Sequence, residues 1–107
     1  MKIKLKTICH KNQRYDTVGD YYKKGKDYII TISKVGKDLE YSYMIHELIE
    51  MLLVIKRGIN FKDIDDWDIG HLKDKLEPGE IKGCPYFKEH KFANKVERMF
   101  LKELKRS

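Results

Sequence analysis

The sequence predicts a small α+β protein, in which an N-terminal antiparallel sheet of about three strands packs against two long helices. Two observations lead to this fold class. Short segments of alternating or β-branched residues fill the first third of the chain, and two long segments with helical periodicity follow. The 107 residues suffice for one domain, 1–107, with a single modest core, and no segment has the composition of a domain linker.

The expected strands come first along the chain. Residues Lys2–Ile8 alternate basic and apolar side chains, as an edge or half-buried strand does. A second strand is expected from about Thr17 to Tyr22 and a third from Asp27 to Ser33. The stretch Lys23–Lys26 between them contains Gly25, and glycine tolerates the positive φ of a tight turn. The last two strands therefore form a predicted hairpin.

The first long helix is expected to follow the break at residues 35–37. Asp38 is placed to cap its N-terminus, and the helical pattern runs to Lys56 or Arg57. Gly58 is suited to end the helix in the left-handed conformation. A second long helix is expected to start at Pro85, which fits the first helical position, and to reach about Leu104.

Residues 60–83 have no strong pattern. Asn60 could cap a short helix, but four aspartates crowd around Trp67 and favour an acidic, partly ordered connection. The sequence Glu77-Pro78-Gly79-Glu80 has the composition of a turn.

Three ionisable side chains interrupt the first long helix: His46, Glu47 and Glu50. The other residues of this stretch are all apolar: Met44, Ile45, Leu48, Ile49, Met51, Leu52, Leu53, Val54 and Ile55. A helix that is apolar on nearly all sides is buried, and burial of charge is unfavourable without a partner or a metal ion. Because His46 and Glu50 are four residues apart, they project from one face.

The second long helix also points ionisable groups toward the core. On a helical wheel its lysines share one side, and His90 and Glu97 fall in the middle of the other, apolar side with Glu89 nearby. One shared site would satisfy both helices. Imidazole and carboxylate are ligands of zinc and related divalent transition metals, and catalytic zinc typically has three protein ligands.

We therefore predict a metal site, zinc or another divalent transition metal, held by His46, Glu50 and His90. Glu47 would be the general base of a hydrolytic reaction. His90 and Glu97 are about 10 Å apart along the helix axis, too far to share one ion. Glu97 and Glu89 are instead expected to be outer-shell or structural partners, with Arg14 considered for Glu97.

Other interpretations of the same residues stay open. His46 and Glu50 could form a hydrogen-bonded core pair without metal, Glu47 could be a helix-surface acid, and His90 could be a core histidine. The net charge of +6 also admits a nucleic-acid partner, although a lysine-rich solvated surface is the commoner cause. An extended peptide or protein partner could pair with the strand Asp27–Ser33.

The composition also predicts where in the cell the protein is found and the state of its cysteines. No apolar run approaches the roughly 20 residues that span a bilayer, so no membrane association is expected. The N-terminus lacks the apolar block of a signal peptide, which favours a cytoplasmic protein. Cys9 and Cys84 match no metal-binding spacing, so both are expected to be free thiols.

The chain also resembles a group of uncharacterised proteins encoded in bacteriophage and prophage genomes, between about Gln13 and Arg98. The matching elements are Gln13-Arg14-Tyr15, Thr17, Gly19-Asp20, His46-Glu47-Leu48-Ile49-Glu50, Gly58-Ile59, Asp65-Asp66-Trp67-Asp68, Glu77-Pro78-Gly79, Pro85-Tyr86, Glu89-His90-Lys91-Phe92-Ala93 and Glu97-Arg98. This resemblance implies a phage or prophage origin and a bacterial host cytoplasm, but no particular reaction. Arg14 and Asp20 lie in the matching stretch and are considered for the site.

A shorter resemblance concerns the helix with His46. Its His-Glu-x-x-Glu pattern is similar to the His-Glu-x-x-His motif of the zincin metalloproteases, with Glu50 in place of the second histidine. The resemblance implies a zincin-like minimal core and a metal-dependent peptidase or amide hydrolase. The alternatives are a non-catalytic phage accessory protein that binds a host or virion partner, with a structural His/Glu network, and a nucleic-acid-binding regulator.

Overall fold

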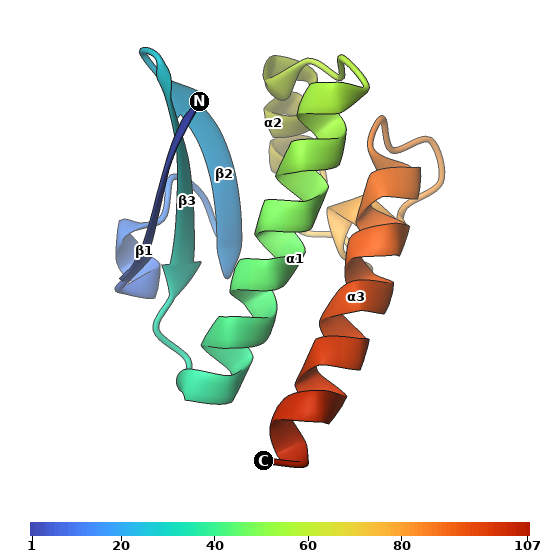
Figure 1. Cartoon of the computed structure of the whole chain (residues 1–107). Coiled ribbons are helices and arrows are strands. Elements are labelled where there is room, and N and C mark those ends of the chain that lie inside the picture. Colours follow the sequence, from blue (N-terminus) through green and yellow to red (C-terminus); the bar gives the residue numbers. More distant parts are fainter.

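A computed structural model describes all residues, 1–107, and contains one sheet, three α-helices and two short 3-10 turns (Figure 1). The expected α+β class is confirmed. The elements in chain order are β1 (Lys2–Ile8), η1 (His10–Asn12), β2 (Gly19–Lys24), β3 (Asp27–Ser33), α1 (Lys37–Lys56), α2 (Phe61–Gly70), η2 (Pro78–Glu80) and α3 (Phe87–Lys105).

The sheet is mixed, so the prediction of an antiparallel sheet was wrong for one of its two pairings. Strands β2 and β3 form the expected antiparallel hairpin, with Gly25 at a φ of 63° in the turn. Strand β1 pairs in parallel with β3, and the strand order is β1-β3-β2. The connection after β1 crosses the C-terminal end of β3 and leads into β2. The hairpin turn after β2 then places β3 between the other two strands of the sheet. Alternation along single strands does not reveal this order.

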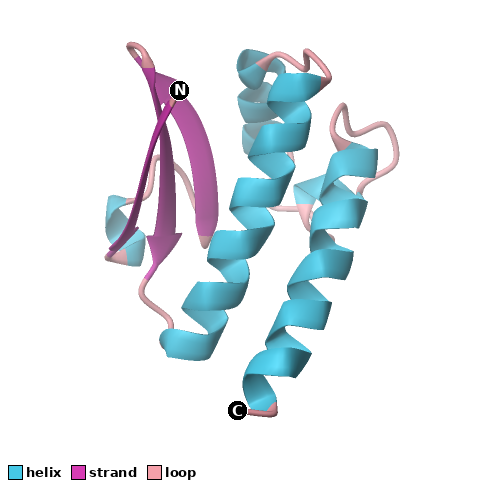
Figure 2. Cartoon of the chain, viewed as in Figure 1, coloured by secondary structure: helices cyan, strands magenta, loops and turns pink.

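The central strand β3 is buried on both faces. Ile30 and Ile32 face the helices and belong to the main apolar core. Thr31 lies on the other face, where the Gln13 side-chain carbonyl accepts a hydrogen bond from its hydroxyl at 2.8 Å. The segment after β1 thus covers the outer face of the sheet, seen beside the magenta strands in Figure 2. Only the edge strand β1 stays largely exposed.

Helix α1 lies between the sheet and α3, which explains its nearly all-round apolar composition (Figure 1). The helix begins at Lys37, and Asp38 does not cap it. Instead the Glu40 carboxylate accepts a hydrogen bond from the Gly36 amide at 2.8 Å. Gly58 follows the helix with a φ of 69°, the left-handed conformation expected of it.

The acidic stretch is more ordered than expected and forms helix α2. The Asn60 side chain caps this helix by accepting a hydrogen bond from the Lys62 amide at 2.8 Å. Two of its four aspartates have partners in other segments: Asp65 binds Arg14, and Asp68 accepts hydrogen bonds from two tyrosines. Such long-range partners stabilise a helix whose local composition is poor, and local composition cannot predict them.

The remaining boundaries differ little from those expected. β2 starts at Gly19 instead of Thr17, and α3 starts at Phe87 because Cys84–Tyr86 forms a turn. The main core comprises Tyr21, Ile30, Ile32, Met51, Val54, Ile64, Cys84 and Tyr86. Both cysteines are free. None of the helices combines the length and apolar composition that crossing a bilayer requires.

Candidate metal centre

Helices α1 and α3 bring together the three residues predicted as metal ligands. The Glu50 Oε1 atom lies 3.3 Å from His46 Nε2 on the same helix and accepts a hydrogen bond from His90 Nδ1 at 2.8 Å across the interface. All three side chains are buried, with exposed fractions of 6%, 4% and 8% for His46, Glu50 and His90. Their potential ligand atoms lie within 4.8 Å of one another. This buried group could hold a metal ion.

One of the spacings in this group matches the coordination of a small divalent cation. Around a tetrahedral zinc ion with bonds of about 2.0–2.1 Å, neighbouring ligand atoms lie about 3.3 Å apart. The distance from Glu50 Oε1 to His46 Nε2 has this value. The distance from Glu50 Oε1 to His90 Nδ1 is shorter, as befits a hydrogen bond.

Glu47 lies beside this group, as the predicted role of base requires. Its Oε2 atom is 3.6 Å from His46 Nε2, and 12% of its side chain is exposed. Strand β2 approaches closely here, since a Cβ atom on Gly19 would come within 2.8 Å of the Glu47 side chain. Glycine at this position therefore makes room for Glu47, a constraint that the sequence did not reveal.

Glu97 of α3 contacts the outward nitrogen of His46, with 2.8 Å between Oε1 and Nδ1. A carboxylate at the second nitrogen of a ligating histidine orients the ring and raises its basicity. Arg14 does not contact Glu97; it binds Asp20 and Asp65. Glu89 lies away from the centre, where it forms a 2.6 Å ion pair with Arg57 at the end of α1.

The second nitrogen of His90 faces the turn η2, a neighbour that the sequence did not predict. Glu77 Oε2 lies 3.5 Å from His90 Nε2. A Cβ atom on Gly79 would come within 2.4 Å of the His90 ring, so only glycine lets the turn pack on the imidazole. The Trp67 indole donates a hydrogen bond to the Pro78 carbonyl at 2.8 Å and fixes the turn. Glu77, Glu80 and His90 also cluster, but both carboxylates are exposed.

The electrostatics of the centre follow from its burial and its crowded carboxylates. Burial opposes charge on both imidazoles, yet nearby carboxylates, Glu50 first, raise the pKa of His46 to about 11 and that of His90 to about 9. Burial alone would raise the pKa of Glu50, but the two histidines hold it below its usual range. Burial raises the pKa of Glu47. Without a metal ion, both imidazoles therefore carry a charge at neutral pH.

The centre lies in the wall of an open cleft of about 460 Å³. The walls come from the segment before β2, β2 itself, α1, α2, α3 and the connection between α2 and α3. Besides the centre they include Asp20, Tyr21, Asp68, Asp74 and Glu77. Asp20 is thus near the centre, but the Arg14 guanidinium holds its carboxylate with bonds of 2.7 and 2.9 Å.

His46 Nδ1 and His90 Nε2 are buried and face the carboxylates of Glu97 at 2.8 Å and Glu77 at 3.5 Å, although neither contact has the geometry of a hydrogen bond. The Tyr21 hydroxyl is also buried and unpartnered. Unpaired buried polar atoms are rare in folded proteins. The two imidazole nitrogens that face Glu50, His46 Nε2 and His90 Nδ1, are the ones placed to bind an ion.

Comparison of the chain with protein-family models, with curated protein sequences and with solved structures found no match.

Proposed function

We propose that this protein is a metal-dependent hydrolase of peptide or other amide bonds, with zinc or a related divalent transition metal held by His46, Glu50 and His90. The convergence of these three buried side chains at the wall of an open cleft carries the proposal. Two imidazoles and one carboxylate match the donor set of catalytic zinc, and three protein ligands leave a position for water or substrate.

Each residue has a role that its position supports. His46, Glu50 and His90 would hold the ion, and Glu97 would orient His46 through its Nδ1 atom. The ion would supply Lewis acidity, which polarises an amide carbonyl and makes water a better nucleophile near neutral pH. Glu47 would take the proton from that water at a carboxylate oxygen, since Oε2 lies 3.6 Å from His46 Nε2 on the cleft side. A raised pKa suits this base to work near neutral pH.

The proposal includes the cellular location of the protein. The resemblance to phage and prophage proteins supports a protein that acts in the cytoplasm of a bacterial host.

One observation favours a different function. Glu50 already contacts two charged imidazoles, so the network can balance its own charges without an ion. The chain would then be a non-catalytic phage accessory protein that binds a host or virion partner.

Two substitutions separate these functions. Glu47→Gln should retain the metal ion and lose hydrolysis of a casein or peptide-library substrate, whereas His46→Ala should lose both. Glu103→Gln, at the exposed end of α3, is the control and should change neither. The hydrolase proposal fails if Glu47→Gln turns over substrate as fast as the natural protein. The accessory proposal gains if neither protein binds metal and His46→Ala lowers the melting temperature equally with and without a chelator.

A further inference from the structure

The sheet has a free edge that lies away from the cleft, along strand β1. The strand order β1-β3-β2 makes β1 an outer strand, and its residues pair only with β3 (Figure 1). None of them lines the cleft, whereas the other outer strand, β2, forms part of the cleft wall. An extended peptide cannot pair with β3, as the sequence suggested, because β3 is the central strand and both its edges are occupied. The edge of β1 instead offers unpaired backbone N–H and C=O groups to a further strand.

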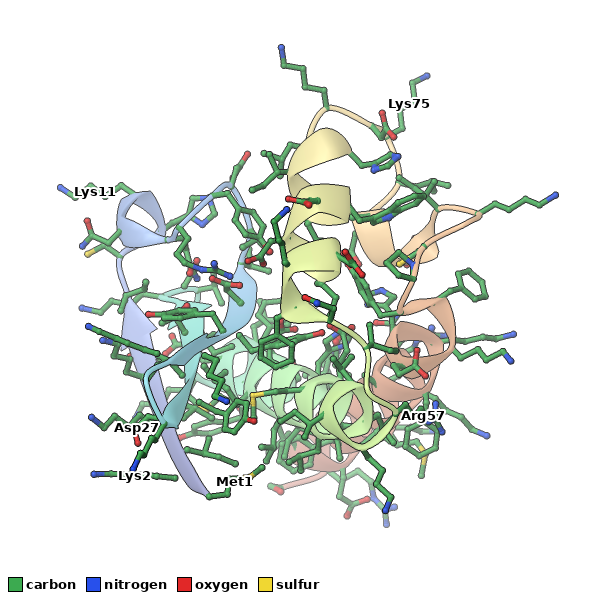
Figure 3. All side chains as sticks on the ribbon, turned by 90° about the horizontal axis from the view of Figure 1, so that it is seen from above. Met1, Lys2, Lys11, Asp27, Arg57 and Lys75 are labelled. Carbon is green, nitrogen blue, oxygen red and sulfur yellow. The ribbon has the colours of Figure 1, made fainter.

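The face of β1 that points away from the helices is basic. It contains Lys2, Lys4 and Lys6, and Figure 3 shows Lys2 there beside Asp27, the residue of β3 with which it pairs. All three lysines are exposed, and only Lys4 has an ion-pair partner, Asp27 at 3.4 Å. The first 37 residues of the chain contain ten lysines and arginines but only three aspartates and no glutamate. The positive charge on this face is therefore largely unbalanced.

The opposite face of β1 is apolar and incompletely covered. Leu5 pairs with Ile30, which faces the helices, so Ile3 and Leu5 lie on the helix side of the sheet. Helix α1 packs mainly on β2 and β3. Ile3 and Leu5 consequently remain 36% and 39% exposed. A strand added at the free edge would extend this apolar face and remove part of both side chains from water.

These two faces define the strand that fits the edge. Residues opposite one another on neighbouring strands share a face, and opposite charges in such a pair are favourable. The fitting strand thus has acidic residues at every second position and apolar residues between them.

Other occupants fit less well. In a sheet continued through the β1 strands of two copies, with the helices of both on one side, lysines would lie opposite lysines, which disfavours a second copy of this chain. A nucleic acid would match the lysines but would leave the backbone groups of the edge unpaired and Ile3 and Leu5 exposed.

We propose that the free edge of β1 binds an extended segment of another protein, in which acidic and apolar residues alternate, as a fourth strand of the sheet. The acidic side chains lie beside the three lysines, and the apolar side chains lie beside Ile3 and Leu5. The surface is separate from the cleft, so this inference goes beyond the proposed hydrolase and does not depend on a metal ion.

The test uses blocked, fluorophore-labelled peptides of about nine residues, whose anisotropy reports binding to the whole protein. One peptide alternates glutamate with valine and threonine, a second has lysine in place of each glutamate, and a third has the composition of the first with its glutamates consecutive. We expect the first to bind about tenfold more tightly than either of the others at low salt, with an affinity that falls as salt rises. Equal binding of the first and third peptides would overturn the inference, because net charge alone would then explain it.

Substitutions in β1 locate the effect. The double variant Lys2→Glu, Lys6→Glu should reverse the preference, so that the lysine peptide binds more tightly than the alternating glutamate peptide. The control Lys91→Glu, Lys102→Glu makes the same charge change at exposed positions of α3 and should keep the original preference. Leu5→Thr retains β propensity and should weaken binding of the glutamate peptide about threefold. The same preference in the β1 double variant as in the control would contradict the proposal.

N-methylated peptides test the backbone pairing. Alternate amides of a strand point to opposite edges, so methylating one alternate set in the glutamate peptide should abolish binding and methylating the other set should not. Equal affinity of the two methylated peptides would show that no strand is added to the sheet. Displacement of the glutamate peptide by a DNA oligonucleotide of equal charge would assign the lysines to nucleic acid and would also overturn the inference.

Discussion

Two ionic networks differ in how their charged groups meet and in where they lie: the one around Arg14 reaches the cleft only through Asp20, and the one around His46 lies in the cleft wall. The Arg14 guanidinium donates to both oxygens of Asp20, at 2.7 and 2.9 Å, and to both oxygens of Asp65, at 3.0 Å each. In the other network, one carboxylate oxygen, Glu50 Oε1, faces two imidazole nitrogens, His46 Nε2 at 3.3 Å and His90 Nδ1 at 2.8 Å. The first kind of network ties segments together, whereas imidazole nitrogens that converge on one carboxylate oxygen can instead bind a metal ion.

The topology gives each network its role. Arg14 joins the segment before β2 to β2 itself and to α2, so its partners are distant in sequence and its contacts close the fold. The His46 network joins α1 and α3 at the wall of the cleft, where a ligand can enter. We therefore expect changes at Arg14 to alter stability and changes around His46 to alter metal binding.

The largest expected effect on folding is that of Arg14→Met. The substitution keeps part of the side chain that packs on the Tyr22 ring but leaves Asp20 buried without a counter-charge. We expect the free energy of unfolding to fall by about 3 kcal/mol, with metal affinity unchanged after folding. Urea denaturation and metal titration measure the two quantities.

The control is Lys62→Met, which breaks an exposed ion pair with Asp66 on α2 and should leave the denaturation midpoint unchanged. A loss of metal affinity in Arg14→Met without loss of stability would reverse the roles assigned to the two networks.

The second expected effect is a steep pH dependence of metal binding. The pKa values of His46 and His90 are raised to about 11 and about 9, so at pH 7 both metal-free rings hold a proton that a metal ion must displace. Protonation of the two histidines stabilises the metal-free protein at low pH. This stabilisation is lost as the pH rises through the pKa of His90, about 9, and then through that of His46, about 11. Metal affinity should therefore rise with pH, about tenfold per displaced proton and per pH unit between 7 and 8.

Calorimetric titration with zinc in two buffers of different ionisation enthalpy counts the released protons. We expect about two at pH 7. An affinity that is independent of pH in this range would mean that the histidines are not the ligands.

The third effect concerns two glutamates on the same helix, Glu97 and Glu89. Because Glu97 contacts His46 Nδ1, Glu97→Gln should weaken zinc binding about 10-fold to 100-fold. Glu89 contacts Arg57 outside the centre, so Glu89→Gln should lower stability and leave zinc affinity unchanged. Competition with a fluorescent zinc indicator measures both affinities. Equal losses in the two variants would refute the role of Glu97 in orienting His46.

The smallest effect tests how closely the turn η2 supports His90. A Cβ atom in Gly79→Ala would come within 2.4 Å of the imidazole, so either the ring or the turn must move. We expect a loss of about 1–2 kcal/mol in stability and a weaker metal affinity. Gly70→Ala is the control, because a Cβ atom there meets nothing within 4 Å. If both alanine variants bind zinc like the natural protein, the turn does not position His90.

Local patterns in the sequence predicted much of this architecture. Alternation and β-branched residues predicted β1 and β3 with the bounds that the structure has, and apolar periodicity predicted α1. The spacing of His46 and Glu50, with the place of His90 on the apolar side of α3, predicted residues that the fold brings together.

The features that the sequence did not predict depend on contacts between distant segments. The parallel pairing of β1 with β3 depends on where a ten-residue connection carries the chain. Helix α2 depends on partners such as Arg14, 51 residues from Asp65 in sequence. Tyr21 and Glu77 join the cleft through tertiary packing: no motif includes Tyr21, and the turn composition around Glu77 does not indicate that it faces His90. Close approaches at Gly19 and Gly79 leave no sequence signal beyond the glycines themselves.

The most direct test of the central claim is the metal content of the protein purified without an affinity tag, measured by elemental analysis beside His46→Ala and after refilling with zinc. We predict about one equivalent of zinc or another transition metal in the natural protein and none in His46→Ala. Absence of metal from the natural protein, even after refilling, would contradict the claim and leave His46, Glu50 and His90 as a buried structural network.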